Sequence, residues 1–429
     1  MMRRMALSVA ALLWICGSVA SAEEPSEWAK THLDELVKLY THFHTHPELS
    51  YLERETSQRL AEEFDAAGLK VTTNVGGFGV VGVLENGEGK QLLLRADLDA
   101  LPVTEATGLD YASKVRVKNP TGDGMVGVMH ACGHDVHMTN LVGVARYLAA
   151  HKDRWQGKIV FIGQPAEERI GGAKAMLEDG LYERFGKPDF ALALHVSSRY
   201  PTGTIAYRGG FAMANVDSAD ITVRGVGGHG ASPNTTIDPI VQAAQLVLAL
   251  QTIVSREISP IEPAVVTVGS IHAGSKHNII SNECQLLLTI RSYSPEVRKQ
   301  IIDAIKRKAK GVAIVAGAPE PTVKITEGTD AVFNDQDLVE RLVPVFRNVL
   351  GEKNVIPAPQ TMGAEDFGLF SRQGVPVFMF GLGSITAERL KSLKRPISLH
   401  SPLYYPDVRP TLVTGITAMS SAAINLLKR

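Results

Sequence analysis

The sequence predicts an α/β protein with a mostly parallel central sheet flanked by helices, plus an inserted ferredoxin-like α+β domain. Toward both ends of the chain, short apolar strands alternate with helices, a pattern typical of a parallel sheet. The middle of the chain instead follows the order β-α-β-β-α-β, which is typical of a ferredoxin-like sandwich. The 429 residues are 45% apolar and 21% charged, which suffices for two cores and excludes disorder for the bulk of the chain.

The elements of the first part of the chain follow from apolar spacing and from breakers. Leu33, Leu36, Val37 and Tyr40 share one face of a helix, and a second helix over residues 54–67 ends at Gly68. Apolar runs predict the strands that follow, at residues 80–84, 91–96, 158–163 and 190–194. Helical patterns between them cover residues 135–150 and 172–177.

The pattern changes near residue 212. From there the sequence predicts strands at residues 218–224, 264–271, 285–291 and 322–326, with helices at residues 239–254 and 295–313. A helix over residues 337–350 and a strand over residues 375–380 then return to the first pattern. We therefore expect one domain from residues 23–212 and 327–429, with residues 213–326 inserted as a second domain.

Residues 1–22 have the features of an export signal. Arg3 and Arg4 precede an apolar run over residues 6–20, and Ala20-Ser21-Ala22 is a small-x-small cleavage site. The sequence thus predicts cleavage after Ala22 and export, to the periplasm or the medium. An uncleaved membrane anchor is the alternative, and no membrane contact is expected once the signal is removed.

Charge and cysteine content limit the classes of partner. Lys plus Arg number 44 against 45 Asp plus Glu, a net charge of -1, so no broad positive surface is available for nucleic acid. Three cysteines are too few for a disulfide scaffold. After signal removal Cys132 and Cys284 remain, and they either pair as a disulfide or leave Cys132 for another use.

The densest chemical signal is the run His130-Ala131-Cys132-Gly133-His134-Asp135-Val136-His137. It places three histidines and a cysteine within eight residues. On a loop that enters a helix at Asp135, Cys132 and His134 can converge on one metal ion. The alternative is a buried cysteine followed by helix-capping residues.

Two pairs of carboxylates follow predicted strands. Glu167 and Glu168 come after the strand at residues 158–163, and adjacent side chains point different ways, so one can bind metal while the other moves protons. A solvated surface pair is the alternative. Asp97 and Asp99 close the strand at residues 91–96, where they can ligate a metal, orient a ligating imidazole, or cap a turn.

Three further histidines lie far apart in the chain. His195 ends the strand at residues 190–194, His229 lies in a glycine-rich stretch of the inserted domain, and His400 lies near the C-terminus. Each alone fits a packed histidine. Together with the cysteine and the carboxylates, they suggest one or two divalent transition-metal ions.

In this order the motifs resemble the M20 metallopeptidase family, in particular its amidohydrolase branch of hippurate hydrolases, N-acyl-amino-acid amidohydrolases and auxin-conjugate hydrolases. The resemblance runs from His44-Thr45-His46-Pro47 to His400-Ser401-Pro402. It implies a catalytic domain that binds two divalent ions, from among Mn, Zn, Co and Ni, and a lid domain through which the chain forms a homodimer.

The resemblance also implies site residues. The implied metal ligands are Cys132, His134, Glu168, His195 and His400. Glu167 is implied as the general base, and His229 as the lid residue that stabilises the oxyanion, reaching the partner subunit's site. Asn278 is implied as a contact to the substrate carboxylate, with Arg291 assisting. Other branches carry His-x-Asp where this chain has Asp97-Leu98-Asp99, so both aspartates rank behind the five ligands, as orienting or additional ligands.

The expected function is metal-dependent hydrolysis of the amide bond of N-acyl amino acids. A dipeptidase or carboxypeptidase with the same dinuclear site is one alternative, because fold and motifs do not fix the substrate. A non-catalytic periplasmic protein that binds metal or peptide is another. The presence of both Glu167 and Glu168 favours an enzyme, since metal binding alone needs only one of them.

Overall fold

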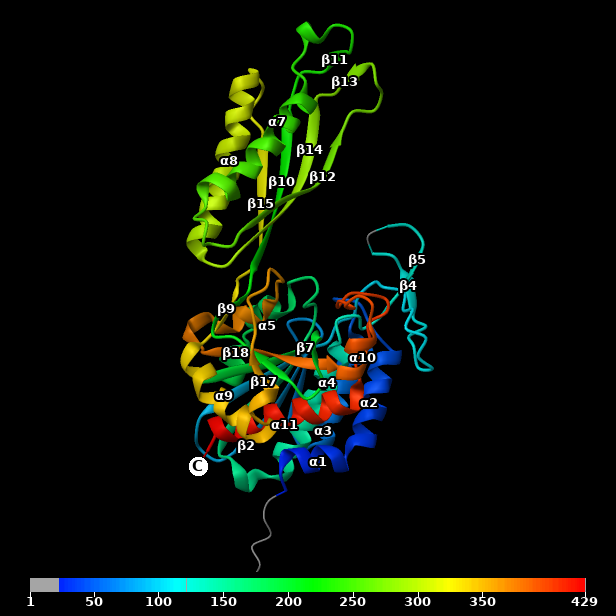
Figure 1. Cartoon of the computed structure of the whole chain (residues 1–429), viewed down its shortest axis with the longest axis vertical. Coiled ribbons are helices and arrows are strands. Elements are labelled where there is room, and N and C mark those ends of the chain that lie inside the picture. Colours follow the sequence, from blue (N-terminus) through cyan, green and yellow to red (C-terminus); the bar gives the residue numbers. More distant parts are fainter. Residues whose placement is uncertain (1–22, 121, 429) are drawn as a thin grey trace, which may run out of the picture.

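The computed structural model of the protein describes residues 23–120 and 122–428, which form a large α/β domain and a smaller, elongated domain above it (Figure 1). The predicted export signal lies outside the described residues. Within the described part of the chain, no helix combines the length and the apolarity needed to cross a membrane.

An eight-stranded sheet forms the centre of the large domain, in the order β1-β2-β6-β3-β7-β18-β8-β17. Its four middle strands run parallel; they are β6 (Gly157–Gln164), β3 (Gln91–Asp97), β7 (Phe190–Pro201) and β18 (Val377–Ile385). The outer strands are β1 (Lys70–Val75), β2 (Gly79–Asn86), β8 (Ile205–Tyr207) and β17 (Val355–Pro357). Strands β3 and β6 are buried on both faces and each carries an apolar run, which confirms the predicted fold class.

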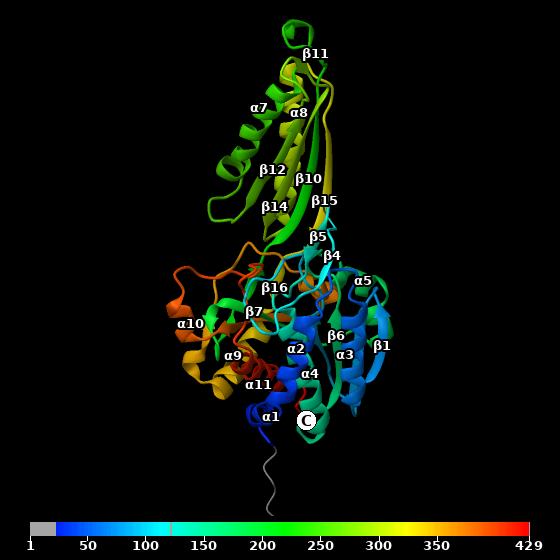
Figure 2. The same cartoon turned by 90° about the vertical axis from the view of Figure 1, so that its right-hand side faces the viewer.

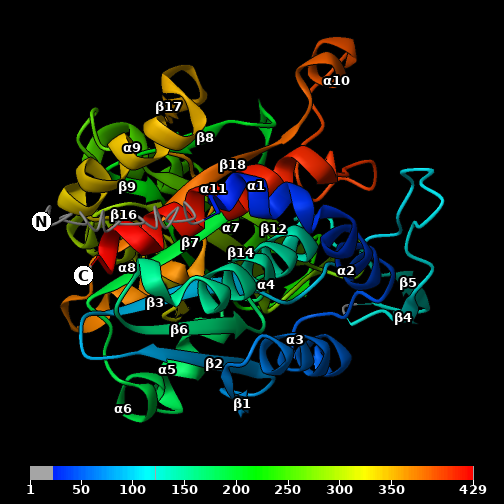
Figure 3. The ribbon, with the colours of Figure 1, turned by 90° about the horizontal axis from the view of Figure 1, so that it is seen from below.

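Helices cover both faces of this sheet. One face packs against α1 (Pro25–Thr31), α2 (Leu33–Thr45), α3 (Arg54–Ala66), α4 (His134–Ala150), α9 (Gln336–Leu350) and α11 (Val408–Leu426). The other packs against α5 (Gly172–Glu178), α6 (Leu181–Phe185) and the 3-10 segment η5 (Asp366–Gly374). Alternation along β7 shows the division, since Leu192 faces the first core and Ala193 the second. Figure 3 shows α4 and α11 side by side against the sheet.

The smaller domain has the predicted ferredoxin-like order of elements. These are β10 (Asn215–Arg224), α7 (Pro239–Thr252), β12 (Val265–Ala273), β14 (Glu283–Ser292), α8 (Pro295–Ala316) and β15 (Thr322–Thr329). The strands form an antiparallel sheet in the order β12-β14-β10-β15. Burial alternates along β14 because α7 and α8 cover one face of the sheet while the other stays open (Figure 2).

Two strands connect the domains. The chain leaves the large domain through β9 (Gly210–Met213) and returns through β16 (Val332–Asn334), and these strands pair with each other at the junction. At the far end of the inserted domain, β11 (Gly228–His229) pairs with β13 (Ile279–Ile280). A hairpin of β4 (Arg116–Lys118) and β5 (Met125–Gly127), and a short helix α10 (Ala387–Ser392), extend from the large domain (Figure 3).

The structure corrects several sequence-based predictions. The strand expected to end at residue 194 continues to Pro201, because β18 pairs with it beyond His195, so His195 lies within β7 rather than at its end. Strand β15 extends to Thr329, past the expected domain boundary at residue 326. Cys132 and Cys284 are both free and lie in different domains, so the disulfide alternative is wrong.

Candidate metal centre

The candidate site lies at the carboxyl ends of the parallel strands, on the side of the large domain that faces the inserted domain. Asp97 ends β3, Glu167 follows β6, His195 lies in β7, and Cys132 precedes α4. Because parallel strands end at one edge of the sheet, residues far apart in the sequence come together there. The site thus follows from the topology of the sheet.

A left-handed glycine places the two α4 residues. Gly133 is the N-cap of α4 with φ 79°, and a β-carbon there would lie 2.5 Å from Cγ2 of Val196. The resulting tight turn directs both neighbours inward. Cys132 Sγ lies 3.5 Å from His195 Nε2, and donor atoms of Cys132, His134 and His195 all lie within 4.8 Å of one another.

His134 has the orientation of a metal ligand. Its Nδ1 donates to the main-chain oxygen of Asp99 at 2.7 Å, so in the neutral ring that binds metal Nε2 carries the lone pair. This buried Nε2 has no hydrogen-bond partner among the described residues. It lies 3.6 Å from Asp97 Oδ2 and 3.9 Å from Glu167 Oε2. A buried lone pair aimed at carboxylates fits a cation between them.

Glu168 and His400 form the outer side of the cluster. Buried Oε1 of Glu168 also lacks a hydrogen-bond partner in the described structure, and it lies 3.3 Å from His400 Nε2. His400 adopts φ 66° and donates its main-chain N–H to Ala131, while its side chain is 55% exposed. Donor atoms of Cys132, Glu168 and His400 lie within 4.8 Å of one another. The structure therefore brings all five predicted ligands together, in two groups that share Cys132.

Asp97 and Asp99 hold neighbouring groups in place by accepting hydrogen bonds from them. The Asp99 carboxylate accepts hydrogen bonds from the main-chain N–H of Glu167 at 3.1 Å and of Glu168 at 3.0 Å, so it holds the loop that carries both glutamates. Asp97 accepts from His137 Nδ1 at 2.6 Å and from Arg95 at 2.7 Å. His137 Nε2 in turn accepts from Val196 N–H at 2.9 Å, so both its ring nitrogens are used.

Sequence reasoning missed a buried acidic group and its arginine. Arg95 lies inside β3, fully buried, and contacts Glu365 at 2.8 Å and Asp366 at 3.3 Å. Carboxylate oxygens of Glu167, Glu365 and Asp366 lie within 4.8 Å of one another. The available signal was an arginine in an otherwise apolar strand, because a buried guanidinium needs acidic partners.

Burial and like charges shift the protonation of these groups. Burial raises the pKa of Glu167 well above its ordinary value, and Glu365 and Glu168 raise it further. Burial lowers the pKa of His134, but Asp97 and Asp99 outweigh it and raise the pKa to about 10. Burial also raises the pKa of the Cys132 thiol, so metal binding there must displace a proton. The cluster therefore has an excess of negative groups that a divalent cation would balance.

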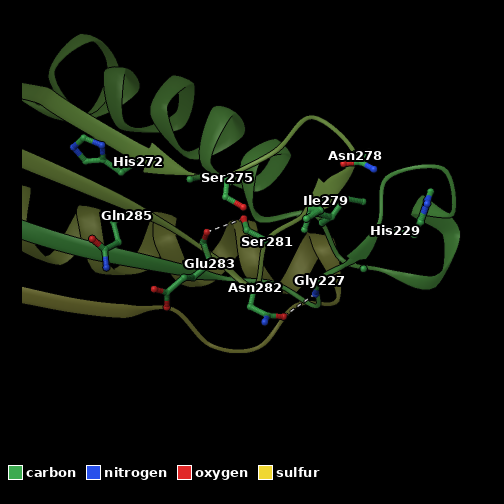
Figure 4. A pocket seen from close by; sticks show the side chains of 14 residues that line it. Gly227, His229, His272, Ser275, Asn278, Ile279, Ser281, Asn282, Glu283 and Gln285 are labelled. Atoms are coloured by element: carbon green, nitrogen blue, oxygen red, sulfur yellow. Dashed lines mark hydrogen bonds between the residues drawn. The ribbon is translucent and has the colours of Figure 1, made fainter.

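The predicted residues of the inserted domain lie elsewhere. His229 and Asn278 are neighbours at the far end of that domain, where Gly230 N–H donates to the main-chain oxygen of Asn278. Both residues line an open hollow of about 880 Å³ (Figure 4). Ala231 N–H donates to His229 Nδ1, so the neutral ring carries its proton on Nε2. Arg291 lies at the domain junction and donates to the Met362 oxygen. The structure brings none of these three to the metal centre.

A buried cluster of cysteine, histidine and carboxylate donors beneath an inserted domain defines a metal-dependent hydrolase. The chain belongs to peptidase family M20/M25/M40, whose model matches residues 93–393. This confirms the predicted resemblance and supports divalent metal ions at the site.

The names of two relatives describe different hydrolase activities. The chain is 38% identical over 340 residues to the hippurate hydrolase of Campylobacter jejuni, covering 78% of this chain and 85% of that protein. It is 36% identical over 351 residues to thermostable carboxypeptidase 1 of Saccharolobus solfataricus, covering 81% and 85%. The structure resembles a crystal structure from Bacillus subtilis described as a dinuclear metal binding peptidase of the M20 family, with TM-score 0.76, 28% identity, and coverage of 93% and 99%.

Proposed function

We propose that the protein hydrolyses the amide bond of N-acyl amino acids with two divalent ions at the site. The observation that carries the proposal is the pair of buried, unpartnered donor atoms, His134 Nε2 and Glu168 Oε1, which lie 4.0 Å apart. The residues that would hold the ions are Cys132, His134, Glu168, His195 and His400. Two groups of donors that share Cys132 support two ions, and this mixed donor set suits Mn, Zn, Co or Ni.

Bound ions of this kind polarise a carbonyl group and lower the pKa of water. Glu167 Oε2 lies 3.9 Å from His134 Nε2, beside the proposed ion site, and its raised pKa suits a group that accepts and returns a proton. In the reaction, the oxygen of water bonds to the carbonyl carbon, and Glu167 takes the proton of that water. It then delivers the proton to the nitrogen as the C–N bond breaks, releasing a carboxylic acid and a free amino acid.

The inserted domain supplies the remaining groups in this proposal. His229 presents an N–H at Nε2 that can donate to the oxyanion, and Asn278 travels with it toward the substrate carboxylate. Both lie far from the cluster within one chain, so they act through closure of the domain or from a second subunit (Figure 1).

Exposed apolar side chains support a homodimer formed through the inserted domain. On α7, Val241 is 55% exposed and Leu248 is 71% exposed, and Ile271 on the neighbouring strand β12 is 50% exposed. Apolar surface of this kind is typical of an interface between subunits. Export with cleavage after Ala22, to the periplasm or the medium, completes the proposal.

The test uses residues 23–429, stripped with chelator and reloaded with Mn or Zn. Release of amino acids is measured from a panel of N-acetyl and N-benzoyl amino acids and, in parallel, from dipeptides. Metal-dependent release from the acyl substrates is the expected result. Release from dipeptides alone would move the function to a peptidase, the second candidate favoured by the similarity to a carboxypeptidase. With metal bound and no substrate cleaved, the binding-protein alternative would replace the enzyme.

A further inference from the structure

A cavity in the large domain opens directly beside the metal centre. It has a volume of about 210 Å³ and lies between β7, β8, β9, β16 and β18, just below the domain junction. His195 lines it, and so does Leu399, the residue before His400. One of the five proposed metal ligands therefore lines the cavity, and a second follows a lining residue in the chain, so a substrate held at the centre can extend into it.

The wall of the cavity is apolar. Ala206, Ala212, Met213 and Met379 line it, and its volume is small beside the about 300–1,000 Å³ of typical ligand pockets. Several of its polar lining residues are already bonded within the protein. Arg208, for example, donates to Phe211, Ala358 and Gln360, and the Asn334 side chain bonds to Met379. The cavity thus suits one apolar side chain rather than a longer peptide.

One cation at the cavity differs from the others. Arg199, on the last part of β7, is exposed, and its guanidinium has no hydrogen bond or ion pair to any other residue that the structure describes. The nearby metal centre is strongly acidic, with Asp97, Glu167 and Glu168 on its inner side. An anionic substrate needs a positive group near this centre, and a guanidinium binds carboxylate with paired N–H donors.

The residues predicted to bind the substrate carboxylate do not line this cavity. Asn278 is neutral and lies at the far end of the inserted domain, and Arg291 donates to Met362 at the junction. Arg199 instead shares a cavity with the metal ligand His195.

We propose, on the basis of the function proposed above, that this cavity binds the amino-acid half of the substrate. The apolar side chain enters the cavity and the α-carboxylate pairs with Arg199. The acyl half carries no charge, so only the amino-acid half matches an apolar wall with a cation at the same cavity. The enzyme then prefers N-acyl derivatives of apolar amino acids, such as methionine, leucine and phenylalanine, over those of glycine.

The test compares N-acetyl-methionine, its uncharged amide, and N-acetyl-glycine with the metal-loaded, full mature chain. Burial of the side chain should favour methionine over glycine by about ten- to hundred-fold in kcat/KM.

Arg199→Gln should raise KM for N-acetyl-methionine about ten-fold with little change in kcat, and should leave kinetics on the amide unchanged. Arg199→Lys should restore part of the loss, and Ala212→Leu should lower the methionine-to-glycine ratio about ten-fold.

Arg409→Gln is the matched control, because it removes an exposed arginine that pairs with Asp34 and does not line the cavity. An equal effect of Arg199→Gln on the acid and the amide, or equal cleavage of the glycine and methionine substrates, would overturn the inference. Failure of the proposed function is distinguished by calorimetry. If no amide is cleaved, the binding of L-methionine and L-methioninamide is compared. Tighter binding of L-methionine that is lost in Arg199→Gln still supports the proposed cavity site. Equal binding of the two compounds refutes it.

Discussion

In the proposed mechanism, Glu167 transfers the proton while neighbouring residues bind the metal ions. It lies among carboxylates that repel its charge, yet the proposed ligands are its neighbours rather than Glu167 itself. Glu167→Gln should therefore lower kcat by about 10²–10⁴-fold, because general-base catalysis contributes that much, with metal content unchanged. Metal analysis and kinetics on one preparation check this. Loss of metal from the variant would make Glu167 a ligand instead.

The same substitution should stabilise the metal-free protein. The pKa of Glu167 is raised in the fold, so its favourable contribution exists below its ordinary pKa and is lost as pH rises through the higher, folded pKa. Glutamine is neutral at every pH, so the variant should gain about 1–2 kcal/mol above neutral pH, as relief of a strained site commonly yields. Urea unfolding of both chelated proteins at pH 5 and pH 8 measures this, and a gap that shrinks as pH rises would contradict it.

His44 provides a second pH-dependent prediction. Burial lowers its pKa, but hydrogen bonds to Asp135 at 2.7 Å and Glu105 at 3.2 Å outweigh burial and raise the pKa to about 9. A rise from 6.5 to about 9 corresponds to about 3 kcal/mol of stability, present below pH 6.5 and lost as pH rises through 9.

His44→Gln should accordingly destabilise the protein most at pH 6 and least at pH 10, in denaturant unfolding. His46→Gln, which changes an exposed histidine at the end of the same helix, is the control and should show little change at either pH. A cost of His44→Gln that stays constant with pH would exclude the charged form of His44.

Residues in dense motifs could be predicted, and their isolated partners could not. Cys132, His134, Glu167 and Glu168 were found because each lies in a short run of metal-capable or acidic residues. Arg95 and Glu365 lie 270 positions apart in the sequence. Their pairing depends on tertiary packing, and neither residue has a local pattern that points to the other.

At the scale of the elements, the turn before α4 leaves no room for a side chain at Gly133. Gly133→Ala introduces both left-handed strain and a clash with Val196, so it should cost at least about 2 kcal/mol in the free energy of unfolding. By displacing Cys132 and His134 it should also weaken metal binding about 10–100-fold, as loss of orienting contacts does.

Gly68→Ala is the control for this element. Gly68 has φ 80°, and a β-carbon there meets nothing within 4 Å, so it isolates the backbone strain at about 1 kcal/mol. The metal affinity of the Gly68→Ala variant should equal that of the unsubstituted protein. Equal metal affinities for both variants would show that the turn at Gly133 does not position the ligands.

Strand prediction succeeded where burial leaves a strong pattern. Strands β3 and β6 each carry an apolar run, and their positions were predicted within a few residues. The end of β7 was missed because Ser197 and Arg199 are polar, and pairing with β18, not apolarity, holds that segment extended. Strands β4 and β5 are short and largely exposed, so no periodicity marks them.

At the scale of the whole molecule, the proposed role of His229 needs either domain closure or a second subunit, because β11, which carries His229, lies at the far end of the inserted domain (Figure 2). Action from a second subunit predicts complementation between two inactive variants, Glu167→Gln and His229→Ala. Mixed one to one and allowed to exchange subunits, they should regain about a quarter of the normal activity, because half the dimers are mixed and each has one complete site.

Leu248→Asp supplies the control for complementation. The charge on this exposed α7 residue should shift the protein to monomers in analytical ultracentrifugation and abolish recovery in the mixture. No recovery between dimeric variants that do exchange subunits would place His229 in the site of its own chain.

The most direct test of the account is anomalous diffraction from crystals of the mature protein grown with Mn. The proposed ligand set predicts one peak among Cys132, His134 and His195 and a second among Cys132, Glu168 and His400, with Glu167 free beside them. A peak bound by Glu167, Glu365 and Asp366, with none at Cys132, would contradict both the ligand assignment and the role of Glu167 as the base.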